Sequence, residues 1–78
     1  MKKVEIYSTP TCTYCNMAKE FFKTNNIVYT EYNVASDAEK RTEMIEKSGQ
    51  MGVPVISIDG QLIIGFDKPT ISKTLGLS

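Results

Sequence analysis

Residues 3–25 read KVEIYSTPTCTYCNMAKEFFKTN, and they contain the change of pattern that decides the fold. Over residues 3–8, β-branched and aromatic side chains alternate in a way that predicts a strand. From Thr13 the apolar side chains recur at helical spacing, which predicts an amphipathic helix to about Asn25. Pro10 separates the two patterns. The chain is therefore expected to pass from a strand, through a short loop, into a helix.

The middle of the chain continues the alternation of strands and helices. Residues 27–34 are β-branched and aromatic, and they predict a second strand. Residues 36–48 predict a second helix, with a capping box between Ser36 and Glu39 at its start and Gly49 at its end.

The C-terminal third predicts a β-hairpin and a short helix. Residues 53–58 and 61–64 are apolar runs, and the link Asp59-Gly60 between them is a strong hairpin signal. A last helix is predicted after Asp67. The order is therefore β-α-β-α-β-β-α, which predicts an α/β protein. We expect a four-stranded mixed sheet, with its first two strands parallel and helices flanking both faces.

Composition limits the classes of function. Nine basic and nine acidic residues give a formal net charge of zero, so neither nucleic acid nor a membrane surface is an expected partner. The apolar runs are too short to span a bilayer, and no apolar segment follows Met1 as it would in a signal peptide. The absence of histidine removes most hydrolase and zinc-enzyme mechanisms. We expect residues 1–78 to form one soluble, cytoplasmic domain.

The two cysteines of the chain are Cys12 and Cys15, at the start of the first predicted helix. Unpaired N–H groups and the helix dipole favour an anion there, so Cys12 is expected to be a reactive thiolate. Cys15 lies one turn inside the helix, close enough to form a disulfide and more buried. A C-x-x-C pair beside a βαβ unit is typical of redox proteins. We predict that Cys12 attacks a disulfide and that Cys15 resolves the mixed disulfide.

Other interpretations of the cysteine pair remain open. Two cysteines without a histidine do not complete a tetrahedral zinc site, so no metal ligands are predicted. A structural disulfide would close a loop too short to stabilise the fold much. Both thiols could also be inert core residues in a module that only binds a partner.

Pro54 opens the third strand, where its missing N–H is tolerated. One interpretation is a plain strand-opening proline. The other is a cis bond between Val53 and Pro54, which would turn the main chain of Val53 toward the cysteines. The Val53 main chain could then pair with an extended substrate.

Four motifs together resemble the glutaredoxin family over nearly the whole chain. They are Cys12-Thr13-Tyr14-Cys15, Ala18-Lys19, Gly52-Val53-Pro54 and Gly65-Phe66-Asp67, in this order and spacing. The resemblance implies the thioredoxin fold, a cis-proline at Pro54, and the reduction of protein disulfides or glutathione mixed disulfides. It also implies a monomer without a tightly bound cofactor, with glutathione as a co-substrate. The substrate-binding residues it implies are Thr13, Tyr14, Val53, Pro54, Gly65, Phe66 and Asp67.

Several positions depart from the usual glutaredoxin pattern. Thr13 replaces the proline of the motif, and Thr9 replaces a lysine that binds glutathione. Gly65-Phe66, followed by Pro69, resembles instead the hydrogen donors of ribonucleotide reductase, which take electrons from thioredoxin reductase. The electron donor is thus either glutathione or thioredoxin reductase.

Two residues and one function have alternative interpretations. Asp67 is either a ligand-binding residue or the N-cap of the last helix. Tyr14 either covers the thiolate or is simply exposed. Because some glutaredoxins without the motif proline carry clusters, Thr13 leaves a second function open. This is an iron–sulfur carrier that holds a [2Fe-2S] cluster at a dimer interface through Cys12 and glutathione.

Overall fold

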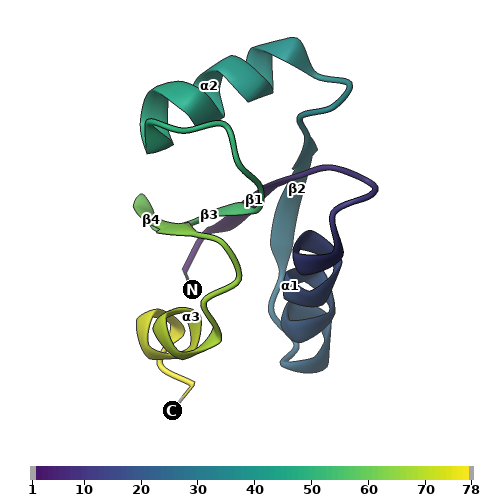
Figure 1. Cartoon of the computed structure of the whole chain (residues 1–78). Coiled ribbons are helices and arrows are strands. Elements are labelled where there is room, and N and C mark those ends of the chain that lie inside the picture. Colours follow the sequence, from purple (N-terminus) through teal and green to yellow (C-terminus); the bar gives the residue numbers. More distant parts are fainter. Residues whose placement is uncertain (1, 78) are drawn as a thin grey trace.

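The computed structural model describes residues 2–77, and its elements follow the predicted order (Figure 1). Three helices alternate with the strands, and a hairpin precedes the last helix, as the sequence predicts. The elements are β1 (Val4–Ser8), α1 (Thr13–Thr24), β2 (Tyr29–Asn33), α2 (Ala38–Ser48), β3 (Val55–Ile58), β4 (Gln61–Ile64) and α3 (Lys68–Leu75).

The four strands form one mixed sheet in the order β2-β1-β3-β4. β1 runs parallel to β2, and it runs antiparallel to β3 on its other side. β3 and β4 form the predicted antiparallel hairpin. The connecting residues Asp59 and Gly60 have φ values of 50° and 89°, the positive values that a two-residue hairpin turn of this kind requires.

Helices cover both faces of the sheet, as Figure 1 shows, with α1 and α3 on one face and α2 on the other. Each face has its own apolar cluster, because successive side chains of a strand point to opposite sides. Buried residues on the α1 and α3 face are Val4, Ile6, Ala18, Phe22, Ile56, Ile58, Ile63 and Ile71. Those on the α2 face are Tyr7, Val34, Met44 and Val55.

The predicted capping box at the start of the second helix is wrong. The N-cap of α2 is Asp37, whose Oδ1 accepts a hydrogen bond from the Lys40 N–H at 3.1 Å. Ser36 instead lies in the turn that follows β2, where its hydroxyl donates to the carbonyl of Asn33 at 3.4 Å. The physical reason is that the Asp37 carboxylate can itself cap a helix that begins one residue later, while the Ser36 hydroxyl is engaged by Asn33. The predicted end at Gly49 is confirmed, with φ of 74°.

Two strands begin two residues later than the sequence predicts. β2 begins at Tyr29 rather than at Ile27, because the N–H of Ile27 donates to the Phe22 carbonyl at 2.8 Å and closes the end of α1. β3 begins at Val55, because the two residues before it form a loop that turns through a cis bond between Val53 and Pro54. Across residues 2–77, every helix is too short or too polar to traverse a membrane.

Candidate active site

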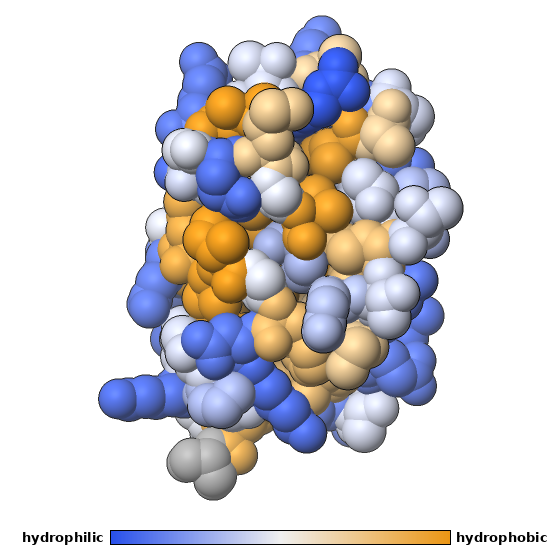
Figure 2. All heavy atoms as spheres, viewed as in Figure 1, coloured by the Kyte–Doolittle hydropathy of each residue, from blue (hydrophilic) through white to orange (hydrophobic). Residues whose placement is uncertain are grey.

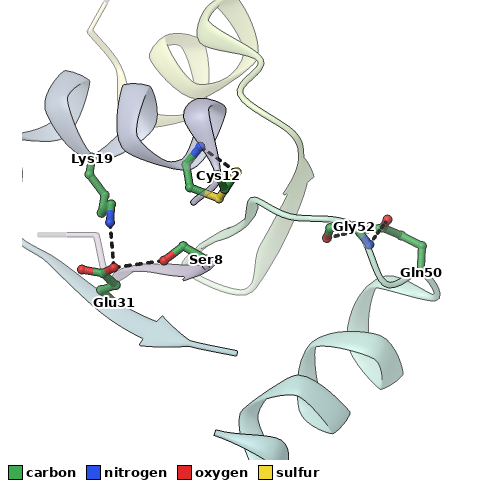
Figure 3. Close-up of a disulfide and its surroundings, with 7 residues drawn as sticks. Ser8, Cys12, Lys19, Glu31, Gln50 and Gly52 are labelled. Carbon is green, nitrogen blue, oxygen red and sulfur yellow. Dashed lines mark hydrogen bonds and ion pairs between the residues drawn. A yellow bond between two sulfur atoms is a disulfide. The ribbon is translucent and has the colours of Figure 1, made fainter. Parts of the chain in front are cut away.

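Cys12 and Cys15 form a disulfide at the first turn of α1, with 5.2 Å between their Cα atoms. Cys12 is the N-cap residue of the helix, in an extended conformation, and its sulfur accepts a hydrogen bond from the Cys15 N–H at 3.1 Å (Figure 3). A sulfur atom thus occupies the position that a serine or aspartate oxygen usually takes at a helix N-terminus. The predicted placement of the pair at this helix end is confirmed.

The two cysteines differ in exposure. Cys15 has no exposed surface, whereas Cys12 is partly exposed. This difference arises because Cys15 lies on the face of α1 that packs against the sheet, while Cys12 precedes the helix. The expectation that Cys15 is the more buried cysteine is confirmed. Of the two cysteines, only Cys12 is accessible from the surface.

The segment before β3 and the segment before α1 leave the same end of the antiparallel ladder between β1 and β3. The last pair of that ladder is Tyr7 with Val55, and from there β1 leads on toward Cys12 while Val53 and Pro54 precede β3. The bond between Val53 and Pro54 is cis, which confirms the second of the two interpretations of Pro54. Among residues 2–77, no partner hydrogen-bonds to the Val53 main chain.

The loop between β4 and α3 borders the same region. The N–H of Gly65 donates to the Pro54 carbonyl at 2.8 Å, which fixes this loop against the cis-proline segment. Phe66 packs its ring on that of Phe21 in α1, with the ring centroids 5.9 Å apart. Of the two interpretations of Asp67, the structure supports the N-cap, because its carboxylate accepts from both the N–H and the hydroxyl of Thr70.

A groove of about 650 Å³ lies between α1 and α3, and Phe66 forms part of its wall. Met17 and Phe21 line the groove from α1, and Leu77 lines it from the end of the chain. Figure 2 shows moderately hydrophobic side chains in the region of these two helices, with hydrophilic ones below them. Tyr14, one turn before Met17 on the helix, is 62% exposed. This exposure favours the second interpretation of Tyr14.

A polar network that sequence reasoning missed lies close to the disulfide (Figure 3). Lys19 of α1 forms an ion pair with Glu31 of β2 at 2.8 Å, and the buried hydroxyl of Ser8 donates to the same oxygen at 3.0 Å. The hydrogen bond from Lys19, reinforced by that from Ser8, lowers the pKa of Glu31 although burial opposes it. These residues come from three elements, and the register of β1 with β2 and the packing of α1 bring them together.

A second polar network holds α2 on the other face of the sheet. The buried Tyr7 hydroxyl donates to Glu43 of α2 at 2.5 Å, and Tyr32 donates to Glu5 at 2.6 Å. Burial first, and then the Glu43 hydrogen bond, raise the pKa of Tyr7. The hydrogen bond to Glu5, with burial, raises the pKa of Tyr32 to about 12. Lys40 lies 4.3 Å from the centre of the Tyr32 ring and also pairs with Glu43.

Metal binding by this chain alone has no support within residues 2–77. No group of three or more His, Cys, Asp or Glu side chains there is placed to hold a metal ion. The cluster-carrier alternative, which uses a second subunit and glutathione, stays a prediction, as does the monomeric state.

Comparison with known proteins shows which family this chain resembles in sequence. The sequence model of the family described as Glutaredoxin matches residues 4–63. Glutaredoxin 3 of Escherichia coli K12 is 43% identical over 67 residues, which cover 86% of this chain and 81% of that protein. A glutaredoxin-like 8.6 kDa protein of the rubredoxin operon of Clostridium pasteurianum is 50% identical over 72 residues. That match covers 92% of this chain and 96% of the clostridial protein.

Solved structures agree with the sequence comparison. A mutant of the thioredoxin-like protein BC3987 superposes with a TM-score of 0.92 at 35% identity, and the match covers 100% of both chains. The predicted thioredoxin fold is therefore confirmed, and so is the predicted family. The chain belongs to the glutaredoxin family and is a thiol–disulfide oxidoreductase.

Proposed function

We propose that Cys12 is the nucleophile that reduces disulfide substrates and that Cys15 is the resolving thiol. One observation carries this assignment. Cys12 is partly exposed at a helix N-terminus and its sulfur already accepts the Cys15 N–H at 3.1 Å, whereas Cys15 is fully buried. A hydrogen bond to the charged form, together with the helix dipole, favours a thiolate at Cys12.

The proposed reaction begins when the Cys12 thiolate attacks one sulfur of a substrate disulfide. A bond forms between Cys12 Sγ and that sulfur, the substrate disulfide breaks, and the second substrate sulfur leaves as a thiolate that takes a proton from water. Cys15 then loses its proton and attacks Cys12 Sγ. This step forms the intramolecular disulfide and releases the first substrate sulfur as a thiol. Two electrons pass to the substrate, and the cysteine pair is oxidised.

The main chain of Val53 is the proposed contact for the substrate backbone. Its N–H and C=O groups form no hydrogen bond with residues 2–77, and the segment leads directly into β3, which pairs with β1 at the end that continues toward Cys12. An extended substrate segment could add two hydrogen bonds here, as in strand addition to an open sheet edge. Phe66 supplies an apolar neighbour for substrate side chains in the groove between α1 and α3.

Thioredoxin reductase is the proposed electron donor. Position 9, where glutathione-dependent members carry a lysine, holds Thr9. The carboxylate of Asp67, which the family uses for ligand binding, is engaged by Thr70 as the cap of α3. A charged tripeptide such as glutathione therefore finds fewer partners here, whereas a protein partner can use the apolar groove.

The assignment of the two thiols is tested with Cys12→Ser and Cys15→Ser. Each reduced protein is mixed with a peptide disulfide, the reaction is quenched by alkylation, and the products are identified by mass spectrometry. We expect Cys15→Ser to accumulate a mixed disulfide with the peptide and Cys12→Ser to carry no attached peptide. Peptide attached to the Cys12→Ser variant would reverse the assignment.

The electron donor is tested on the oxidised wild-type protein. Samples receive either reduced glutathione, or thioredoxin reductase with NADPH, and free thiols are counted over time. We expect the reductase to reduce the pair faster. Rapid reduction by glutathione with none by the reductase would overturn the donor assignment while leaving that of the thiols intact.

A further inference from the structure

The side chain of Gln50 folds back onto the main chain of Gly52, as Figure 3 shows. Its carboxamide oxygen accepts the Gly52 N–H at 2.7 Å, and its carboxamide nitrogen donates to the Gly52 carbonyl at 3.0 Å. One side chain thus occupies both main-chain groups of a single residue. This is the pair of hydrogen bonds that a neighbouring strand would make with that residue.

The base of this contact is fixed to the end of α2. The hydroxyl of Ser48 lies 3.0 Å from the Gln50 carbonyl and 2.6 Å from the Met44 carbonyl. Met44 is the buried anchor of α2 against the sheet. Ser48 therefore links Gln50, in the loop before the cis-proline, to Met44 in the core, and this contact fixes the position of Gln50.

The contact bears directly on Val53, the next residue along the chain. A residue that precedes a proline is restricted to extended conformations. Gln50 holds both main-chain groups of Gly52, so the residue immediately before Val53 is fixed in place. The Pro54 carbonyl, in turn, is held by the N–H of Gly65 at 2.8 Å.

We propose that Gln50 is a positioning residue that presents the Val53 main chain to the backbone of a peptide substrate. It acts by occupying both groups of Gly52, so that of Gly52 and Val53 only Val53 stays available for pairing, which defines the register of the bound peptide. Gln50 itself touches neither the substrate nor the reacting sulfurs. The inference rests on the proposed contact between Val53 and the substrate.

The test compares wild type with Gln50→Met and Gln50→Glu. Methionine keeps the size of the side chain and loses both hydrogen bonds, whereas glutamate keeps the acceptor and loses the donor. Reduced protein reacts in single-turnover experiments with a peptide disulfide or with hydroxyethyl disulfide, which has no peptide backbone. Half-saturating concentration and limiting rate are measured for each substrate. Met51→Ala is the matched control, since its side chain is exposed and next to Gln50.

We expect Gln50→Met to raise the half-saturating concentration of the peptide about fivefold, the loss expected for one weakened hydrogen bond. Gln50→Glu should have a smaller effect, and Met51→Ala none. The limiting rate, and both parameters for hydroxyethyl disulfide, should stay unchanged. Wild-type kinetics for Gln50→Met, or equal losses with both substrates, would overturn the positioning role. Neither result would change the assignment of Cys12 as nucleophile and Cys15 as resolving thiol, because the cysteine variants test that assignment separately.

Discussion

The N–H of Cys15 donates a hydrogen bond to the sulfur of Cys12, with 3.1 Å between the two atoms. This bond is also the N-cap interaction of α1, so one sulfur atom both caps the helix and carries the proposed chemistry. The reactive group is therefore held by the first turn of a helix that packs in the core through Ala18 and Phe22. Substitutions in that turn test the arrangement directly.

Thr13→Pro should stabilise the protein. Thr13 is the first residue of α1, where a proline fits the helix and no intrahelical N–H bond is lost. Cys12 has φ of −82° and ψ of 112°, which suits the residue before a proline. The gain should be about 0.5 kcal/mol, from a more restricted unfolded chain. Thermal unfolding of the reduced protein would show it as a rise in Tm of a few degrees, about 2–4 °C.

Asn16→Pro is the matched control for that substitution. The N–H of Asn16 donates to the Cys12 carbonyl at 3.1 Å, the first bond of the helix, and proline removes it. The free energy of unfolding should fall by about 3 kcal/mol. If both proline variants lowered the Tm equally, the start of α1 at Thr13 would be wrong.

Asp67 should act on stability rather than on catalysis. Asp67→Ala removes the cap of α3 and should lower the free energy of unfolding by about 1 kcal/mol. Asp67→Asn keeps a capping oxygen and should leave both stability and the half-saturating substrate concentration unchanged. Asp37→Ala, at the cap of α2, should lower stability by a similar amount. Urea unfolding measures the capping role of Asp67, and single-turnover kinetics measure a role in ligand binding. Weaker substrate binding by Asp67→Asn would show that the carboxylate binds the ligand.

The stability of the protein should decrease in alkali. Tyr7 and Tyr32 keep their protons in the fold above the ordinary phenol pKa of about 10, and the pKa of Tyr32 is raised to about 12. In this range the unfolded chain binds fewer protons than the folded one, so the free energy of unfolding falls as the pH rises. Tyr32→Phe should lose less stability than wild type between about pH 8 and about pH 11. If urea unfolding showed that wild type and Tyr32→Phe lose the same free energy of unfolding over this pH range, the ionisation of Tyr32 would not be coupled to folding.

Gly52→Ala should weaken peptide binding through Gln50. A Cβ atom at Gly52 would lie 2.7 Å from Gln50 Oε1, so the carboxamide must leave its position while the backbone can stay. Because both changes break the same contact, Gly52→Ala combined with Gln50→Met should be no worse than either alone. The half-saturating concentration of the peptide disulfide measures this. Additive losses would mean that the two residues act independently.

Local chemistry accounts for the parts of the fold that were predicted. Three predicted features depend only on neighbouring residues, and each is observed. They are the change from strand to helical spacing after Pro10, the turn at Asp59-Gly60, and the end of α2 at Gly49. The cap of α2 was misplaced because Ser36 and Asp37 are adjacent and both have side chains that can cap a helix. Local sequence gives no measure of which acceptor the preceding turn engages.

The sequence alone determined the order of elements, the pair Cys12 and Cys15 at a helix start, and the family resemblance, because these depend on spacing along the chain. Tertiary structure alone decided which distant groups meet. Ser8, Lys19 and Glu31 converge only through the register of β1 with β2 and the packing of α1. The free main chain of Val53 likewise depends on how the loop after α2 reaches β3. Such contacts join residues far apart in sequence or depend on loop conformation, and periodicity carries no information about either.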